Sequence, residues 1–227
     1  STPETQGVDS EMLAESVDFL LQQRQLYEIH SLTILRHGNL IADVSFYPYR
    51  TSSLHDLASV SKVFTTTLIG MAIDQGYIES VNERVLDFFP DRQVKNLDHW
   101  KQSLTVEHLL TMTSGLGSID VIDTERMLNS EDWVQFALDL PMKHPPGTHW
   151  KYHQPTAFLL SAILTRATGM SAFEFARVNL FNPLGIERAH WSASPNGISY
   201  GYHHLKLKPI DLAKFGQLIL RNGRWQE

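Results

Sequence analysis

The order of the expected secondary-structure elements is the feature that most restricts the fold. Two β-like runs, 31–37 and 40–47, stand near the N-terminus, and helical patterns dominate the sequence after residue 58. Gly38-Asn39 between the runs is typical of a two-residue hairpin turn, because glycine readily adopts a positive φ. Strands do not alternate with helices, which argues against a parallel sheet. We therefore predict an α/β fold of the α+β type, in which helices flank an antiparallel sheet beside a mostly helical subdomain.

Apolar spacing and end signals place the helices. We expect a first helix after Asp9, which serves as its N-cap, with an apolar face made by Leu13, Val17, Leu20 and Leu21. The next helix is expected from Ser59 to Gln75, with Gly76 as its stop. Further helices are predicted near 105–113 and 131–138, from Pro155 to Gly169, after a capping box at Ser171–Glu174, and from Pro209 to Gly223.

The same signals predict three segments along the chain. Residues 1–58 hold the N-terminal helix and hairpin of an α/β subdomain. Residues 59–170 form the mostly helical subdomain. Residues 171–227 supply helices that return to the α/β subdomain. With 227 residues, the chain is long enough for one domain or two closely packed subdomains with a real core.

Composition excludes several classes of function. Nineteen basic and 25 acidic side chains give a formal charge of −6, and no basic run stands out, so we expect no nucleic-acid partner. The absence of cysteine excludes disulfides and thiol catalysis. No stretch has the length of a membrane-spanning helix. The segment Ser1–Glu4 is neither basic nor apolar, so no export signal is visible and the localisation stays open.

Ser59 and Lys62 form an S-x-x-K motif at the start of the second predicted helix. A spacing of three places the two side chains on one helical face. A serine hydroxyl becomes an effective nucleophile when a neighbouring base takes its proton. A lysine can be that base when burial beside a helix N-terminus lowers its pKa from the free value of about 10.4. The same turn offers backbone N–H groups, including that of Ser59, to an oxyanion.

Several further segments, read with this motif, resemble the family of serine β-lactamases and penicillin-binding proteins, in its class C β-lactamase and esterase branch. The resemblance lies in 57–65 (LASVSKVFT), 104–116 (LTVEHLLTMTSGL), 145–152 (PPGTHWKY), 182–186 (NPLGI) and 211–216 (DLAKFG), in family order over nearly the whole chain. It implies a β-lactamase/transpeptidase-like fold and hydrolysis through an acyl-enzyme, with neither a metal nor another cofactor.

The resemblance also implies a third catalytic residue. In such enzymes a Tyr-x-Asn motif faces the serine–lysine pair, and its tyrosine shares the proton transfers. Tyr152-His153-Gln154 aligns with that motif, so Tyr152 takes this role and Gln154 is expected to bind substrate. Gln154 departs from the usual asparagine: its amide keeps the same donors and acceptor, but its side chain is longer. The departure favours an ester or peptide-like amide over a β-lactam as the substrate.

The family's third motif, a Lys/His-x-Gly on a late strand, would lie beyond residue 227. That strand normally supplies the second N–H of the oxyanion hole. A single hairpin is also marginal as a sheet. The sequence therefore predicts that the C-terminal strands are missing from this chain. The chain is expected to be a fragment, a nicked product, or one part of a split protein whose fold a separate C-terminal polypeptide completes.

Other motifs point elsewhere. Residues 197–201 match G-x-S-x-G, but that nucleophile motif requires a strand–turn–helix, and the residues before it predict a loop. His149 and His153 have the spacing of a zinc-binding helix, yet prolines interrupt the segment, so we expect no metal site. Thr113-Ser114-Gly115 is expected to be structural, with Gly115 as a helix cap.

The sequence thus predicts a serine hydrolase that transfers the acyl group of a small ester or amide through Ser59, Lys62 and Tyr152. Carboxylesterase or peptidase-like activity is favoured over β-lactamase activity. The alternative from a different class is a non-catalytic β-lactamase-like module that binds or senses a ligand. Replacing Ser59 with alanine separates the two, because reversible binding would survive that change. A third possibility, metal-dependent hydrolysis, would be excluded by full activity after chelation.

Overall fold

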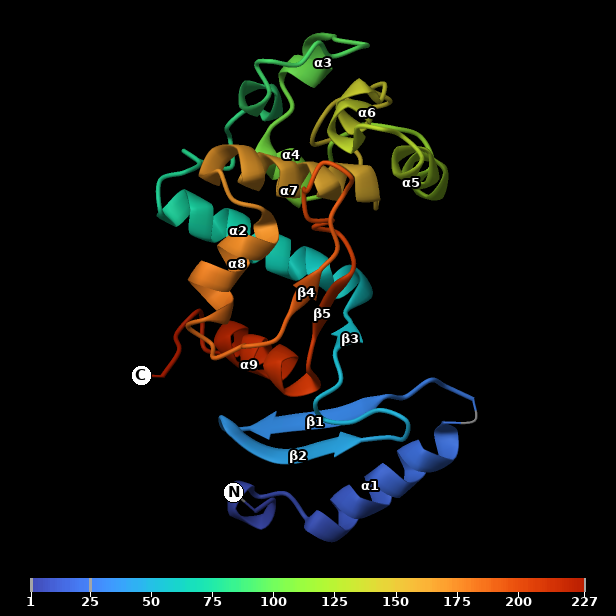
Figure 1. Cartoon of the computed structure of the whole chain (residues 1–227), viewed down its shortest axis with the longest axis vertical. Coiled ribbons are helices and arrows are strands. Elements are labelled where there is room, and N and C mark those ends of the chain that lie inside the picture. The colour runs from blue at the N-terminus through green and yellow to red at the C-terminus, as the bar shows by residue number, and fades with distance from the viewer. Residues whose placement is uncertain (1, 25, 227) are drawn as a thin grey trace. The chain divides into compact units, whose positions relative to one another are not determined.

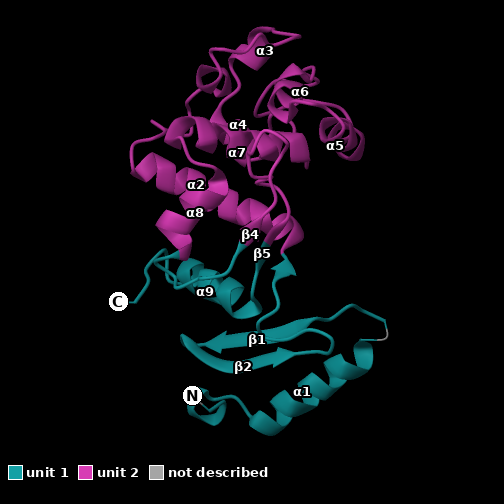
Figure 2. Ribbon diagram, viewed as in Figure 1, with its two compact units in different colours: residues 1–56, 182–189, 206–227 teal, residues 57–181, 190–205 magenta. Residues whose placement is uncertain are grey.

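The computed structural model describes residues 2–24 and 26–226, which form two compact units (Figure 2). Unit 1 comprises residues 1–56, 182–189 and 206–227, and unit 2 comprises residues 57–181 and 190–205. Helices and small antiparallel sheets make up both the fold and its core, so the predicted mixed α/β class is confirmed.

Unit 1 contains the hairpin and the two terminal helices (Figure 1). Its elements are a 3₁₀ turn at Glu4–Gln6, α1 (Ser10–Gln23), β1 (Ser31–Arg36), β2 (Asn39–Ser45), β3 (His55–Asp56) and α9 (Pro209–Leu220). Strand β5 (Leu205–Leu207) pairs antiparallel with β3, through His55 opposite Leu207. Helix α9 packs against β1.

The hairpin forms as predicted, but its turn lies one residue earlier. Arg36 pairs with Asn39, so His37 and Gly38 are the two turn residues, with φ of 50° and 78°. Positive φ at both central positions is the geometry that matches the twist of a tight hairpin. A bulge between Ile34 and Leu35 then shifts the register of the remaining pairs.

Helix α1 begins where its cap signal predicts. Asp9 accepts hydrogen bonds from the backbone N–H groups of Glu11 and Met12, which lack partners within the helix. Leu13, Val17 and Leu20 are half-buried, but Leu21 is 51% exposed and does not belong to the same buried face. The predicted apolar face of α1 is therefore correct for three of its four residues.

Unit 2 is built around α7 (Gln154–Thr168), whose residues 155–164 are all buried. Helices α2, α4, α5 and α6 pack against it (Figure 1). The other elements of this unit are 3₁₀ turns at Ala58–Val60 and Val85–Phe88, α2 (Ser61–Asp74), α3 (His99–Gln102), α4 (Val106–Leu110), α5 (Asp120–Leu128), α6 (Trp133–Asp139), α8 (Ala172–Ala176), a π-helical turn at Arg177–Phe181, and β4 (His190–Trp191).

Local signals account for the ends of two of these helices. Gly169 ends α7 in the left-handed conformation, with its N–H bonded to the carbonyl of Thr165. Ser171 and Glu174 form the predicted capping box at the start of α8, where each side chain bonds the other residue's backbone N–H. Among the described residues no single helix is long and apolar enough to cross a membrane; α7 and residues 172–181 meet the length and composition together, as a pair bent by 72°.

Gly115 is structural, but not as a helix cap, because α4 ends at Leu110. Its φ is 72°, and a Cβ at this position would overlap the carbonyl oxygen of His144. The carbonyl of Gly115 in turn accepts a hydrogen bond from the N–H of Lys143 at 2.8 Å. Glycine is required because the backbone of residues 143–144 approaches it directly.

Gly115→Ala is expected to lower the free energy of unfolding by about 2–4 kcal/mol, because left-handed strain adds to displacement of the adjacent backbone. Gly70→Ala is the matched control. Gly70 lies inside α2 with nothing within 4 Å of the position that a Cβ would take, and alanine there should stabilise by about 0.5–1 kcal/mol. Urea denaturation measures both values. Equal effects of the two substitutions would contradict the close approach at Gly115.

Candidate active site

Ser59 lies in the 3₁₀ turn Ala58–Val60, immediately before α2. The helix predicted from about Ser59 is present, but Ser59 itself lies in the 3₁₀ turn and α2 begins at Ser61. Ala58 has φ of 46°, a left-handed conformation that costs about 1–2 kcal/mol for a residue with a Cβ. The hydroxyl of Ser61 holds this turn by donating to the carbonyl of Ala58 at 2.7 Å and accepting from the N–H of Leu205 at 3.2 Å. The turn leaves Ser59 exposed.

The structure brings three of the four predicted site residues together. Ser59 Oγ lies 2.7 Å from Tyr152 Oη, and Lys62 Nζ lies 2.6 Å from the same phenol oxygen. Lys62 Nζ is 3.3 Å from Ser59 Oγ. Ser59 lies in the turn before α2 and Lys62 in the first turn of α2, whereas Tyr152 precedes α7 and is 93 residues away from Ser59 in sequence. The phenol oxygen is thus closer to both partners than they are to each other.

Tyr202 completes the surroundings of Lys62, and sequence reasoning missed it. Its backbone carbonyl accepts the third hydrogen bond of Lys62 Nζ at 2.9 Å, and its ring centroid lies 5.7 Å from that nitrogen. Three acceptors match the three donors of an ammonium group. Burial raises the pKa of the Tyr202 phenol, which keeps this neighbour of Lys62 uncharged.

The loop that carries Tyr202 is fixed to α2 and α7. Thr65 donates to the carbonyl of Gly201 at 2.6 Å, and Ser161 donates to the carbonyl of Ser199 at 2.7 Å. A Cβ at Gly201 would come within 2.7 Å of the Ser161 side chain, so the close approach requires glycine. No spacing in the sequence signals these contacts.

Gln154 occupies the first position of α7 and is oriented by Asp120 at the start of α5. The backbone N–H of Gln154 donates to Asp120 Oδ1 at 2.6 Å, and its amide nitrogen lies 3.4 Å from Asp120 Oδ2. The described contacts of the Gln154 side chain therefore go to Asp120, and a role in substrate binding stays a prediction.

His153, between Tyr152 and Gln154, belongs to a buried polar network. Its Nε2 lies 3.2 Å from Asp123 Oδ2, and its Nδ1 lies 2.7 Å from Thr156 Oγ1. Burial lowers the pKa of His153, the ammonium of Lys151 adds to this effect, and Asp123 opposes it. A neutral imidazole can donate to the carboxylate and accept from the threonine hydroxyl, which fixes the backbone next to Tyr152.

Two competing motifs do not form sites. Ser199 of the G-x-S-x-G match is 1% exposed and follows a turn rather than standing between a strand and a helix. Its hydroxyl accepts a hydrogen bond from the N–H of Phe173, so the predicted loop is confirmed. His149 stacks on His144 with ring centroids 3.8 Å apart, whereas His153 bonds Asp123 and Thr156, so the two predicted zinc-spaced histidines have different partners.

Comparisons with known proteins identify the family of this chain. The family model described as Beta-lactamase matches residues 26–225. Penicillin-binding protein 4* of Bacillus subtilis is 30% identical over 170 residues, which cover 68% of this chain and 36% of that protein. Esterase EstB of Burkholderia gladioli is 26% identical over 247 residues, covering 97% of this chain and 62% of the esterase.

Solved structures share the fold. The octameric penicillin-binding protein homologue from Pyrococcus abyssi superposes with a TM-score of 0.76 at 19% identity, covering 93% of this chain and 57% of that one. The chain thus spans between about one third and two thirds of the length of these three relatives. Since the family model covers most of the sequence, the chain belongs to the beta-lactamase family.

Proposed function

We propose that this chain carries the catalytic serine of an acyl-transfer hydrolase, with Ser59 as nucleophile and Lys62 and Tyr152 as its proton-transfer groups. The observation that carries the proposal is the convergence of the three polar atoms within 2.6–3.3 Å. A nucleophile within hydrogen-bond reach of a base, which a further group orients in turn, is the arrangement that activates a serine. Relatives named as a penicillin-binding protein, an esterase and a D-aminopeptidase support acyl transfer in general.

The proton route follows from the three distances. As Ser59 Oγ attacks a carbonyl carbon, its proton passes to Tyr152 Oη, the nearer acceptor, at 2.7 Å. Tyr152 accepts this proton as a phenolate and becomes a neutral phenol. The ammonium of Lys62, 2.6 Å from the same oxygen, stabilises the phenolate before the transfer. The proton then returns through Tyr152 to the departing alcohol or amine. This route assigns the first transfer to Tyr152, whereas the sequence motif alone assigns it to Lys62.

The remaining groups complete the proposed acyl transfer. Ser59 lies in the first turn before α2, where backbone N–H groups have no partner within the helix, so its own N–H can bond the oxyanion. Water then hydrolyses the acyl-enzyme, with Tyr152 and Lys62 as the base. We propose small carboxylic esters or peptide-like amides as substrates, because Gln154 replaces the asparagine of the family motif.

The test is to label the folded protein with a fluorophosphonate probe and to locate the label by peptide mass spectrometry. We expect one probe per chain, and we expect it on Ser59, because only an activated serine reacts with this reagent at neutral pH. Label distributed over several serines, or no label on the folded protein, would contradict the proposed activation of Ser59.

A further inference from the structure

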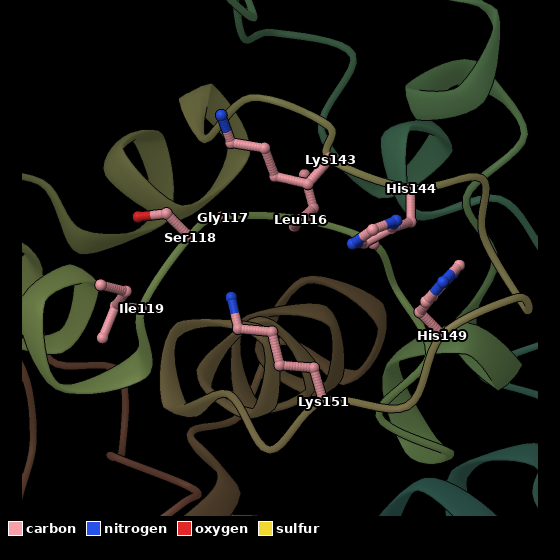
Figure 3. A pocket seen from close by; sticks show the side chains of 9 residues that line it. Leu116, Gly117, Ser118, Ile119, Lys143, His144, His149 and Lys151 are labelled. Carbon is pink, nitrogen blue, oxygen red and sulfur yellow. The ribbon is translucent and has the colours of Figure 1, made fainter.

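A cavity in unit 2, with a volume of about 340 Å³, is lined by none of the three proposed catalytic residues (Figure 3). Its walls come from the loop 115–119 and from the segment 143–151. The charged or ionisable side chains among its lining residues are two lysines and two histidines, namely Lys143, Lys151, His144 and His149. No carboxylate belongs to the lining, and ligand cavities in proteins begin at about this size.

Lys151 is the unusual group in this cavity. Its Nζ is buried and has no hydrogen-bond partner among the described residues. Burying an ammonium group without a partner is costly, and burial accordingly lowers the pKa of Lys151. Figure 3 shows the side chain rising from its own segment toward the backbone of Gly117 and Ser118, which also line the cavity.

Two carboxylates, those of Asp123 and Asp120, interact electrostatically with Lys151, but both already accept hydrogen bonds from other groups. Asp123 accepts from the N–H of Ser118 at 2.6 Å and from His153, and Asp120 accepts from the N–H of Gln154 at 2.6 Å. Both carboxylates favour the charged form of Lys151 through space, but neither bonds its Nζ. Lys151 is therefore a cation that lacks a directly bound counter-charge.

The remaining walls indicate what kind of anion would fit. Leu116 and Ile119 supply apolar surface, and the imidazoles of His144 and His149 are stacked at the other end of the cavity (Figure 3). The N–H groups of Gly117 and Ser118 are already bonded to Pro141 and Asp123, so the loop offers no pair of amides of the kind that usually holds a phosphate. A single carboxylate with an apolar or aromatic part matches these walls better than a phosphate does.

We propose that this cavity is a binding site for a small organic carboxylate, whose anionic group pairs with Lys151 and whose apolar part lies against Leu116, Ile119 and the stacked imidazoles. The site is independent of the proposed hydrolase activity, because it uses none of Ser59, Lys62 and Tyr152. Lys143 at the exposed rim adds a second positive charge that favours the same class of ligand.

The experiment titrates the full chain with benzoate while ¹H–¹⁵N correlation spectra are recorded. We expect saturable shifts in the amides of residues 115–119 and 143–151. Benzamide, which has the same shape without the charge, should bind at least tenfold more weakly, and inorganic phosphate should bind more weakly than benzoate. Equal affinity for benzamide, phosphate as tight as benzoate, or shifts confined to other residues would each overturn the proposal. None of these comparisons requires a variant.

Two variants sharpen the test. Lys151→Met, which removes the charge and keeps much of the side-chain volume, is expected to weaken benzoate binding at least tenfold. Lys95→Met is the matched control, because Lys95 is an exposed lysine of the same unit that does not line the cavity. The Lys95→Met variant should bind benzoate with the affinity of the wild type. Unchanged binding in Lys151→Met would overturn the proposed pairing.

Discussion

Ser59→Ala should abolish labelling by the fluorophosphonate probe and lower the turnover of an activated ester, such as p-nitrophenyl butyrate, by roughly 10⁴-fold or more. The magnitude follows from the loss of the covalent pathway itself, because among the described residues Ser59 is the aliphatic hydroxyl that bonds Lys62 Nζ and Tyr152 Oη. Ser59 is exposed and lies in a turn, so alanine at this position removes no packing from the core. The folded state should be retained, and circular dichroism checks this.

Ser52→Ala is the matched control for this experiment. Ser52 is an exposed serine in unit 1, which places it outside the unit that holds the proposed site. Its labelling and turnover should equal those of the wild type. If Ser59→Ala binds a substrate analogue reversibly while the wild type shows no turnover either, the ligand-sensing alternative is favoured. Residual turnover near the wild-type rate in Ser59→Ala would exclude Ser59 as the nucleophile.

Helix ends were predicted from sequence where the signal is local. Asp9 and the Ser171–Glu174 pair satisfy backbone N–H groups within three residues, and Gly169 supplies a positive φ directly after α7. Such caps depend on short-range hydrogen bonds, which a single segment already contains. Helix α5 (120–128) was missed because its apolar residues do not form one stripe: Val121 and Ile122 are exposed while Met127 is buried.

The errors at the two turns have related physical causes. The hairpin turn was placed at Gly38-Asn39, but the structure uses His37 and Gly38, and histidine adopts the left-handed conformation that was assigned to the glycine alone. Similarly, nothing in the sequence marks Ala58 as left-handed, so the 3₁₀ turn before α2 could not be distinguished from the helix. Conformations of this kind are imposed by tertiary contacts rather than by local preference.

The candidate site also contains residues that could be predicted from the sequence and residues that only the folded chain reveals. Ser59 and Lys62 are three residues apart, so their proximity follows from a helical turn. The expectation for Tyr152 came from its resemblance to a family motif and not from spacing. The carbonyl of Tyr202, which is 140 residues from Lys62, could be found only in the folded chain. Lys151 was passed over because a lysine beside a catalytic motif is ordinary in sequence, and only the fold shows that its ammonium is buried and unpartnered.

Lys62→Met and Tyr152→Phe should each lower the rate constant of probe labelling by about 10²–10⁴-fold, which is the usual contribution of a positioned proton-transfer group. The double variant should be little slower than either single variant. Both residues act on the same proton, because Tyr152 Oη bonds Ser59 Oγ and Lys62 Nζ at once, so removing either one interrupts the whole route. Effects of residues that act as a unit are not additive.

The single-turnover rate of labelling in all four proteins measures this coupling directly, without a substrate having to be known. Lys95→Met and Tyr77→Phe control for the loss of a lysine charge and of a phenol hydroxyl at partly or fully exposed positions in the same unit. If the two single effects multiply in the double variant, Lys62 and Tyr152 act on Ser59 independently. A normal rate in Tyr152→Phe would assign the first proton transfer to Lys62 across the longer, 3.3 Å contact.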